Sequence, residues 1–126
     1  MRLLLDTHVL LWWLIDDDRL AAAAKAAIAE QTNIVHYSPA TIWEVSIKVT
    51  LGRLDLSGAD ILAETRESGF VELPVTGEHA WRAGSLPTHH RDPFDRMLVA
   101  QAEIEQLILV TADKALDAYG IPIPGL

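Results

Sequence analysis

Short runs of apolar residues alternate along this chain with longer segments whose apolar residues recur at helical spacing. The runs predict buried strands at 3–5, 34–37, 70–73, 107–110 and 121–123. The longer segments predict helices at 9–15, 20–29, 60–67, 79–83, 95–105 and 113–118. Because helices alternate with continuously apolar strands from one end to the other, the pattern predicts an α/β fold with a parallel sheet between helices.

The segment from residue 40 to residue 50 carries two conflicting signals. Trp43, Val45 and Ile47 alternate with polar residues, which is typical of a strand with one buried face. Pro39 instead suits the first turn of a helix, and Gly52 follows where such a helix would stop. The pattern leaves strand and helix open for this segment.

The length of 126 residues predicts a single domain spanning the whole chain. Half of the residues are hydrophobic and none is cysteine, so disulfides and thiol chemistry are excluded. The apolar run at the N-terminus is interrupted by Asp6 and lacks a cleavage site, so we expect no signal peptide. No apolar run reaches the length of a membrane span, so we expect no membrane partner.

The net charge of −8 has the wrong sign for a simple nucleic-acid-binding module, because phosphate neutralisation supplies much of the affinity of such modules. A nuclease that holds metal ions with carboxylates is less affected, since bound cations reverse the local field. The charge also suits a basic protein partner.

Four acidic residues stand where segments leave the predicted carboxyl edge of the sheet. Asp6 follows the first strand directly, Asp113 follows the strand at 107–110, and Glu44 and Asp95 lie near the start of the next elements. Ligands of parallel sheets bind at this edge. Two carboxylates about 5 Å apart repel by about 3 kcal/mol at an effective dielectric near 20, so a cluster predicts bound Mg²⁺ or Mn²⁺. Taken singly, each acid is also explained as a helix cap or an exposed residue.

Four stretches of sequence carry a resemblance to a known family. They are LLLDTHVLLW from residue 3, SPATIWEVSIK from residue 38, HRDPFDRMLVAQA from residue 90 and LVTAD from residue 109. In order and spacing they resemble the PIN-domain ribonucleases, and among these the VapC-type toxins of toxin–antitoxin pairs. The resemblance extends over nearly the whole chain.

The resemblance implies a three-layer α/β/α sandwich with a central parallel sheet of four to five strands, and it places Glu44 on a helix. It implies that Asp6, Glu44, Asp95 and Asp113 hold Mg²⁺ or Mn²⁺ for hydrolysis of RNA phosphodiester bonds. Thr7 and Thr111 match supporting positions. The implied partners are the RNA substrate, a cognate antitoxin and a second copy of the chain, and the implied location is the cytoplasm.

Several further residues have two interpretations each. Asp92 competes with Asp95 as metal ligand or helix cap, and we favour Asp95 as the ligand because its spacing to Met97 fits the resemblance. Lys48 and Arg96 either contact RNA phosphates or balance nearby carboxylates.

Histidines and tryptophans lie close to these motifs as well. His8 is expected to be a helix-start residue near the site. His89 and His90 fall in a predicted loop, where they serve either as a general acid or in a solvated or capping role. Arg91 beside them has the same two interpretations as Lys48 and Arg96. Trp12 and Trp43 are expected to be buried in the core or in an interface, although exposed aromatic rings do bind single-stranded nucleic acids.

Two other functions remain open at this point. One is a catalytically silent binding module with the same fold. The other is a metal-dependent DNA nuclease or phosphatase that uses the same acids.

Overall fold

Four parallel strands form the centre of the molecule in the computed structural model, which describes residues 1–56, 59–88, 92–114 and 116. They are β1 (Arg2–Leu5), β2 (Ile34–Tyr37), β3 (Val71–Glu72) and β4 (Ile108–Val110), and their order across the sheet is β3-β2-β1-β4. All three pairings are parallel, with Leu4 opposite both His36 and Leu109. The predicted parallel sheet is therefore confirmed.

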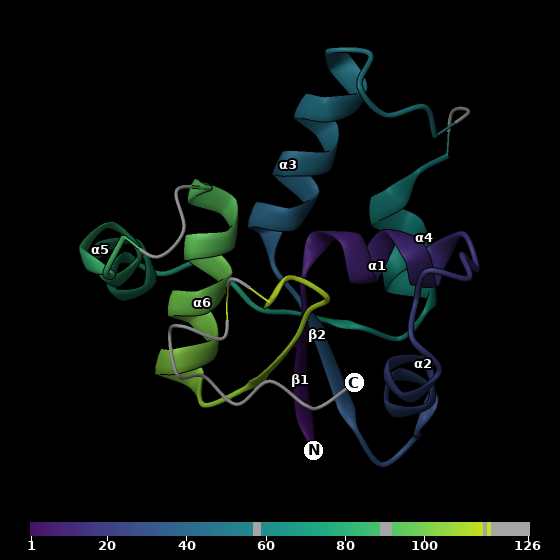
Figure 1. The fold of residues 1–126 in the computed structure, drawn as a ribbon, viewed down its shortest axis with the longest axis horizontal. Helices are drawn as coiled ribbons and strands as arrows, with labels where there is room; N and C mark the ends of the chain where they lie inside the picture. Colours follow the sequence, from purple (N-terminus) through teal and green to yellow (C-terminus); the bar gives the residue numbers. More distant parts are fainter. Residues whose placement is uncertain (57–58, 89–91, 115, 117–126) are drawn as a thin grey trace.

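The described residues form six helices around the sheet: α1 (Thr7–Leu14), α2 (Ala22–Ala29), α3 (Pro39–Thr50), α4 (Ile61–Glu67), α5 (Gly77–Ser85) and α6 (Pro93–Glu105). In Figure 1, α5 and α6 lie on one side of the strands and α1, α2 and α4 on the other, while α3 extends from the end of β2. The arrangement is the expected α/β/α sandwich.

Side-chain alternation along β1 explains the two cores. Leu3 and Leu5 pack with residues of α1 and α2 on one face. Leu4, which points the opposite way, packs with Leu98 and Val99 of α6 on the other face. All three leucines are fully buried. A strand with both faces covered has to be continuously apolar, which is the pattern that predicted it.

The structure resolves the ambiguous segment as helix α3. Ser38 accepts a hydrogen bond from the backbone N–H of Ala40, and Pro39 occupies the first turn. The buried residues are Ala40, Thr41, Glu44 and Val45, which repeat at helical spacing. The strand-like alternation was misleading because two buried positions carry polar residues, while the apolar Trp43 and Val49 are exposed.

Several element boundaries differ from the predicted ones. Helix α6 begins at Pro93 rather than Asp95, because Asp92 is its N-cap and accepts from the backbone N–H groups of Phe94 and Asp95. Strand β3 has only two residues instead of four. Helix α4, in contrast, ends at Glu67 as predicted, and Gly69 follows it with the positive φ of 81° that favours glycine after a helix.

The predicted strand at 121–123 and most of the predicted helix at 113–118 lie outside the described residues, as do His89, His90 and Arg91. Among the residues that are described, no helix is both long and apolar enough to cross a membrane.

Candidate active site

The carboxyl edge of the sheet brings the ends of β1 and β4 side by side. Strand β1 connects onward to β2 and β3 on one side, whereas β4 returns to its other side, so the chain changes direction between β1 and β4. In open parallel sheets this switch point is where ligands bind. Asp6 follows β1 there, and its backbone N–H donates to the Val110 carbonyl oxygen at 3.1 Å.

The Asp6 carboxylate is buried, with only 5% of the residue exposed. One oxygen accepts from the backbone N–H of Val9 at 2.8 Å and caps α1. The other accepts from the hydroxyl of Thr111. Burial raises the pKa of Asp6 above its ordinary value of 3.8, and nearby Asp113 raises it further, while the two hydrogen bonds and His8 oppose this shift.

Asp113 approaches the same carboxylate from β4 through Thr111. The backbone N–H of Asp113 donates to Thr111 Oγ1 at 3.0 Å, and Thr111 in turn contacts Asp6. Asp113 itself is exposed. One threonine therefore connects the loops that follow the two central strands.

Glu44 is the second buried acid and lies on α3. Its Oε1 accepts from the Thr7 hydroxyl at 2.7 Å, and its Oε2 pairs with Lys48 Nζ at 2.8 Å. The Thr7 hydroxyl is also within 3.3 Å of the Thr41 hydroxyl. Because Thr7 follows Asp6 directly, this network connects Glu44 to the start of α1.

Asp95 is half-buried in the first turn of α6, three residues after the cap Asp92. Helix α6 packs beside α3, and the rings of Phe94 and Trp43 meet edge to face with centroids 5.3 Å apart. The capping role that was open between Asp92 and Asp95 belongs to Asp92.

The two basic residues of the predicted site make different contacts. Lys48 pairs with Glu44, and its side chain is about one-third exposed. Arg96 donates to the carbonyl oxygens of Gly84, Leu86 and Pro87, and so fastens the end of α5 to α6. These contacts give Arg96 a structural role at the connection between α5 and α6.

Sequence reasoning missed Thr41, which is almost fully buried against Thr7. Thr41 is three residues before Glu44, so the two share one face if the segment is a helix. The sequence left strand and helix open here, and the shared face could therefore not be predicted.

In the described part of the chain, no three histidine, aspartate or glutamate side chains are close enough together to hold a metal ion. The residues nevertheless fit one chemically. Asp6 is a desolvated carboxylate beside a second carboxylate, and all the candidate donors are oxygen atoms. A divalent cation would relieve the cost that raises the pKa of Asp6, so the charge of this edge favours Mg²⁺ or Mn²⁺.

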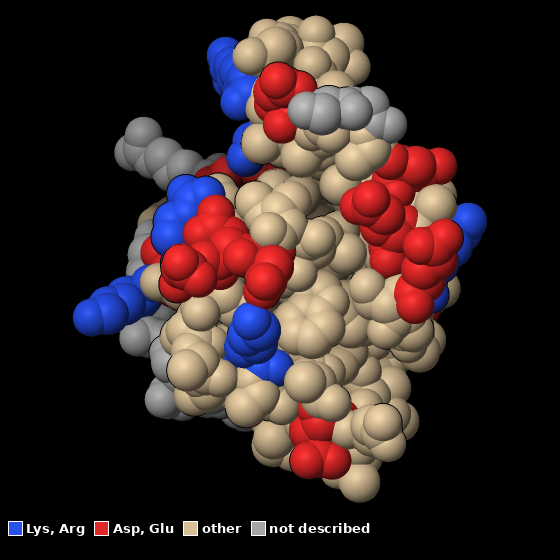
Figure 2. Space-filling model, turned by 90° about the vertical axis from the view of Figure 1, so that its right-hand side faces the viewer, with Lys and Arg blue, Asp and Glu red and all other residues tan. Residues whose placement is uncertain are grey.

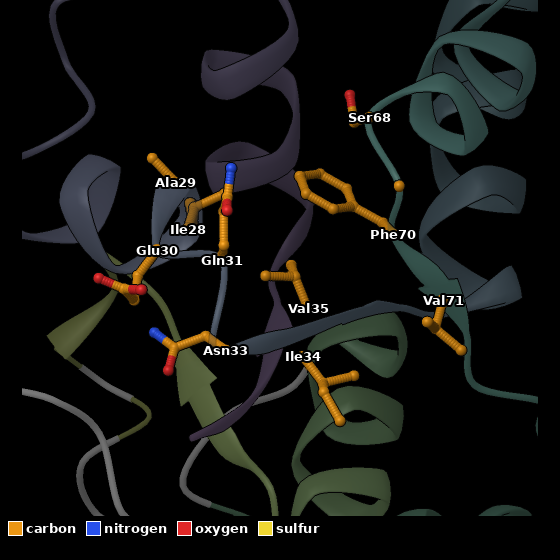
Figure 3. Close-up of a pocket in the computed structure, with 11 residues that line it drawn as sticks. Ile28, Ala29, Glu30, Gln31, Asn33, Ile34, Val35, Ser68, Phe70 and Val71 are labelled. Carbon is orange, nitrogen blue, oxygen red and sulfur yellow. The ribbon is translucent and has the colours of Figure 1, made fainter.

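A second hollow lies at the opposite edge of the sheet. Figure 3 shows Ile34 and Val71, the first residues of β2 and β3, around it together with Phe70 and the end of α2. Among the described residues that line this hollow, Glu30 is the only one with a carboxylate. This hollow shares no residue with the acidic edge, which therefore remains the candidate active site.

Comparison with known proteins identifies the fold family. The profile of the PIN domain matches residues 3–122. The chain belongs to the PIN-domain family. Ribonuclease VapC22 of Mycobacterium tuberculosis is 31% identical over 127 residues, which cover 96% of this chain and 94% of that protein.

Solved structures agree with the fold. VapBC2 of Rickettsia felis, bound to a promoter DNA fragment, contains a chain that superposes with a TM-score of 0.71 at 15% identity, covering 98% of this chain and 96% of the other. FitAcB of Neisseria gonorrhoeae gives a TM-score of 0.64 at 22% identity, with coverage of 96% and 95%. At 15% and 22% identity, this similarity shows a shared fold and does not by itself show a shared function. The PIN architecture expected from the motifs is therefore confirmed.

The burial of Asp6 leads to a pH-dependent stability. Because its pKa is higher in the folded chain, its contribution to stability is present below pH 3.8 and is lost as the pH rises through the raised folded pKa. Asp6→Asn keeps an acceptor for Val9 but carries no charge. In chelator-containing buffer it should therefore increase the free energy of unfolding at neutral pH, with a gain that shrinks toward pH 3.8.

Urea unfolding of both proteins across this pH range measures the difference. Asp18→Asn, the same exchange at an exposed aspartate, is the control and should show no such trend. A gain that instead grows as the pH falls would contradict the assignment.

The hydroxyl of Thr7 can be tested separately. Thr7→Val removes the donor to Glu44 Oε1 and should cost about 1–3 kcal/mol of unfolding free energy, because it leaves a buried carboxylate oxygen without its partner. The matched exchange Thr50→Val, at an exposed position of α3, should change stability by less than about 0.5 kcal/mol. Equal losses in the two variants would show that the Thr7–Glu44 contact contributes nothing.

Proposed function

We propose that this PIN-domain protein is a metal-dependent ribonuclease and the toxin of a toxin–antitoxin pair. The observation that carries the proposal is the buried Asp6 carboxylate at the switch point of the sheet, with Asp113 beside it and Glu44 joined to it through Thr7. The relative VapC22 is named a ribonuclease and aligns over nearly the full length of both chains.

Asp6, Glu44, Asp95 and Asp113 are the residues we assign to Mg²⁺ or Mn²⁺. Bound there, the metal supplies an activated water and neutralises charge that develops on the phosphate. The protein's own part is to fix the ligands before substrate arrives. Val9 and Thr111 hold both oxygens of Asp6, and Thr7 orients Glu44.

Lys48 brings a positive charge to the proposed metal site. Its ammonium group pairs with Glu44 Oε2 and is partly exposed, so it is placed to meet an incoming phosphate oxygen. Asp92 and Arg96 support the site indirectly. Asp92 fixes the start of α6, the helix that carries Asp95, and Arg96 fixes the connection between α5 and α6.

Cleavage of a mixed RNA pool tests the proposal. Wild-type protein with Mg²⁺ or Mn²⁺ should cut RNA, and EDTA should abolish the activity. Asp6→Asn and Asp95→Asn should each lose about two orders of magnitude, the scale of removing one group that stabilises transition-state charge. Asp18→Asn, an exposed aspartate beyond the end of α1, is the matched control and should retain activity.

Two further substrates separate the alternatives. Preference for single-stranded DNA or for a small phosphate ester over RNA would identify the DNA nuclease or phosphatase. A folded chain that cuts none of the three substrates would indicate the silent binding module.

We propose two protein partners. A basic antitoxin suits the net charge of −8, and related folds occur in the VapBC2 and FitAcB assemblies. The test is whether the product of a neighbouring small reading frame blocks cleavage. The lack of cysteine fits the cytoplasm, where we place both proteins.

The second partner is another copy of this chain. Between α3 and α6 lies an apolar hollow formed by Pro39, Ala40, Trp43, Val75, Pro93, Phe94 and Met97. Among the described residues, those that line it carry no charge, and Trp43 is 63% exposed there. The core of a dimer interface has this composition.

Sedimentation equilibrium tests the dimer. We expect a dimer for the wild type and a monomer for Trp43→Glu, because the variant places a charge in the centre of the interface. Trp81→Glu alters another exposed tryptophan outside this hollow and should remain dimeric. Equal masses for all three proteins would exclude this face as the interface.

A further inference from the structure

A hollow of about 460 Å³ lies beside α1, and its lining includes His8 in the first turn of that helix, which Asp6 caps. It lies between α1 and the segment that leads into α4. Its lining consists of His8, Leu11, Trp12, Leu14, Ile15, Arg19, Leu54, Asp55, Leu56, Ala59, Ile61 and Glu64. Most of this surface is apolar, and a few polar groups stand at its border, as in pockets that bind small organic groups.

Three flat side chains of this lining follow one another, and we call them the stacking row: His8, Trp12 and Arg19. His8 and Trp12 are one helical turn apart on α1, with ring centroids 5.9 Å apart and planes inclined by 33°. The Arg19 guanidinium carbon lies 5.3 Å from the centre of the Trp12 ring. The row therefore continues from the helix into the loop after it.

The charge of Arg19 is already balanced. Its Nε and Nη2 atoms donate to both oxygens of Asp17, at distances between 2.7 and 3.2 Å. Of the described residues that line the hollow, Arg19 is the only lysine or arginine, and the carboxylates Asp55 and Glu64 line it as well. A phosphate group would be repelled here, whereas a neutral, flat group would not.

The wider surface supports the same distinction. Figure 2 views the side of the molecule that carries α1, α2 and α4, where carboxylates form separate groups with uncharged surface between them. If a nucleic-acid strand crosses this side, its phosphates have to lie away from the carboxylates, because the two groups repel each other. Uncharged bases can still lie on the surface between.

The stacking row begins at the proposed active site. His8 is two residues after Asp6 and lies in the first turn of α1, the helix that the Asp6 carboxylate caps. A nucleotide whose phosphate is at the acidic edge therefore has its neighbouring base within reach of His8 and Trp12.

We propose that the stacking row is a subsite for one nucleobase of single-stranded RNA, adjacent to the scissile phosphate. This inference rests on the ribonuclease function proposed above. Aromatic rings and guanidinium planes stack on bases of any sequence and fix their position without reading phosphate charge. In a protein this acidic, stacking replaces part of the electrostatic affinity that most nucleic-acid binders use.

Cleavage of short RNAs with an abasic nucleotide at each position in turn tests the proposal. For the wild type, one position beside the cut should lower kcat/KM by about 5- to 150-fold, the range expected for loss of one base–aromatic stack. Trp12→Leu should be about equally slow on intact RNA and should lose little more on the abasic RNA. Trp12→Phe should restore most of the rate.

His8→Ala serves as a second variant, since Trp12 also packs against the core and its replacement can affect folding. His8 is exposed, so its loss tests stacking without a cavity. Trp81→Leu is the matched control, because Trp81 is 83% exposed and lies on α5, away from the hollow. Trp81→Leu should respond to the abasic position as the wild type does.

Binding measurements separate this inference from the proposed activity. In the Asp6→Asn background, fluorescence anisotropy of a labelled single-stranded oligoribonucleotide should show the same dependence on Trp12 and on one base without any cutting. If RNA is never cut but this dependence appears, the ribonuclease proposal fails and the base subsite stands.

Three outcomes would overturn the base subsite. The first is equal sensitivity to every abasic position in the wild-type and Trp12→Leu proteins. The second is no RNA binding at all. The third is a Trp12→Leu protein that cuts and binds RNA normally but loses affinity for a protein partner, which would identify the hollow as a protein-docking surface.

Discussion

The position of the Asp6 carboxylate is the constraint on which the rest of this structure depends. Its two oxygens join the first turn of α1, through Val9, to the loop after β4, through Thr111. Those loops come from the two central strands, on either side of the point where the sheet changes direction. The same atoms thus close the fold and form the floor of the candidate site. Moving Asp6 would uncouple the helix start from the sheet edge.

Burial of this carboxylate is unfavourable by itself, as the raised pKa of Asp6 shows. The surrounding hydrogen bonds reduce the cost but do not remove it. Around Glu44 the protein uses its own cation, Lys48, together with the hydroxyl of Thr7. A bound cation would relieve the cost of burying the Asp6 carboxylate, which supports the proposed metal site.

The two hollows on either side of the acidic edge differ in the chemistry of the side chains that line them. The α3–α6 side offers a purely apolar hollow, which suits another protein surface. The α1 side offers flat aromatic and guanidinium groups next to Asp6, which suit a base. Neither surface depends on excess positive charge, and this agrees with the acidic composition of the chain.

The sequence by itself determined the alternation of elements and the identity of the acids. The run Leu3–Leu5 is apolar because both faces of its strand are covered, and an aspartate directly after such a strand has to lie at the sheet edge. The motifs around Asp6, Glu44, Asp95 and Asp113 were sufficient to indicate the PIN family, and comparison confirmed that family. Their roles as metal ligands remain a proposal.

Tertiary structure decided what local pattern could not. The helical state of α3 depends on burying Thr41 and Glu44 against Thr7, a contact between residues more than thirty positions apart. The start of α6 was decided by a cap, where Asp92 and Asp95 have the same chemistry but only Asp92 has the geometry. Trp43, expected to be buried in a core or an interface, is exposed in the single chain, and Trp12 is half-buried. Hydrophobicity gives the probability that a side chain is covered, but only the packed neighbours determine which of its faces remains free.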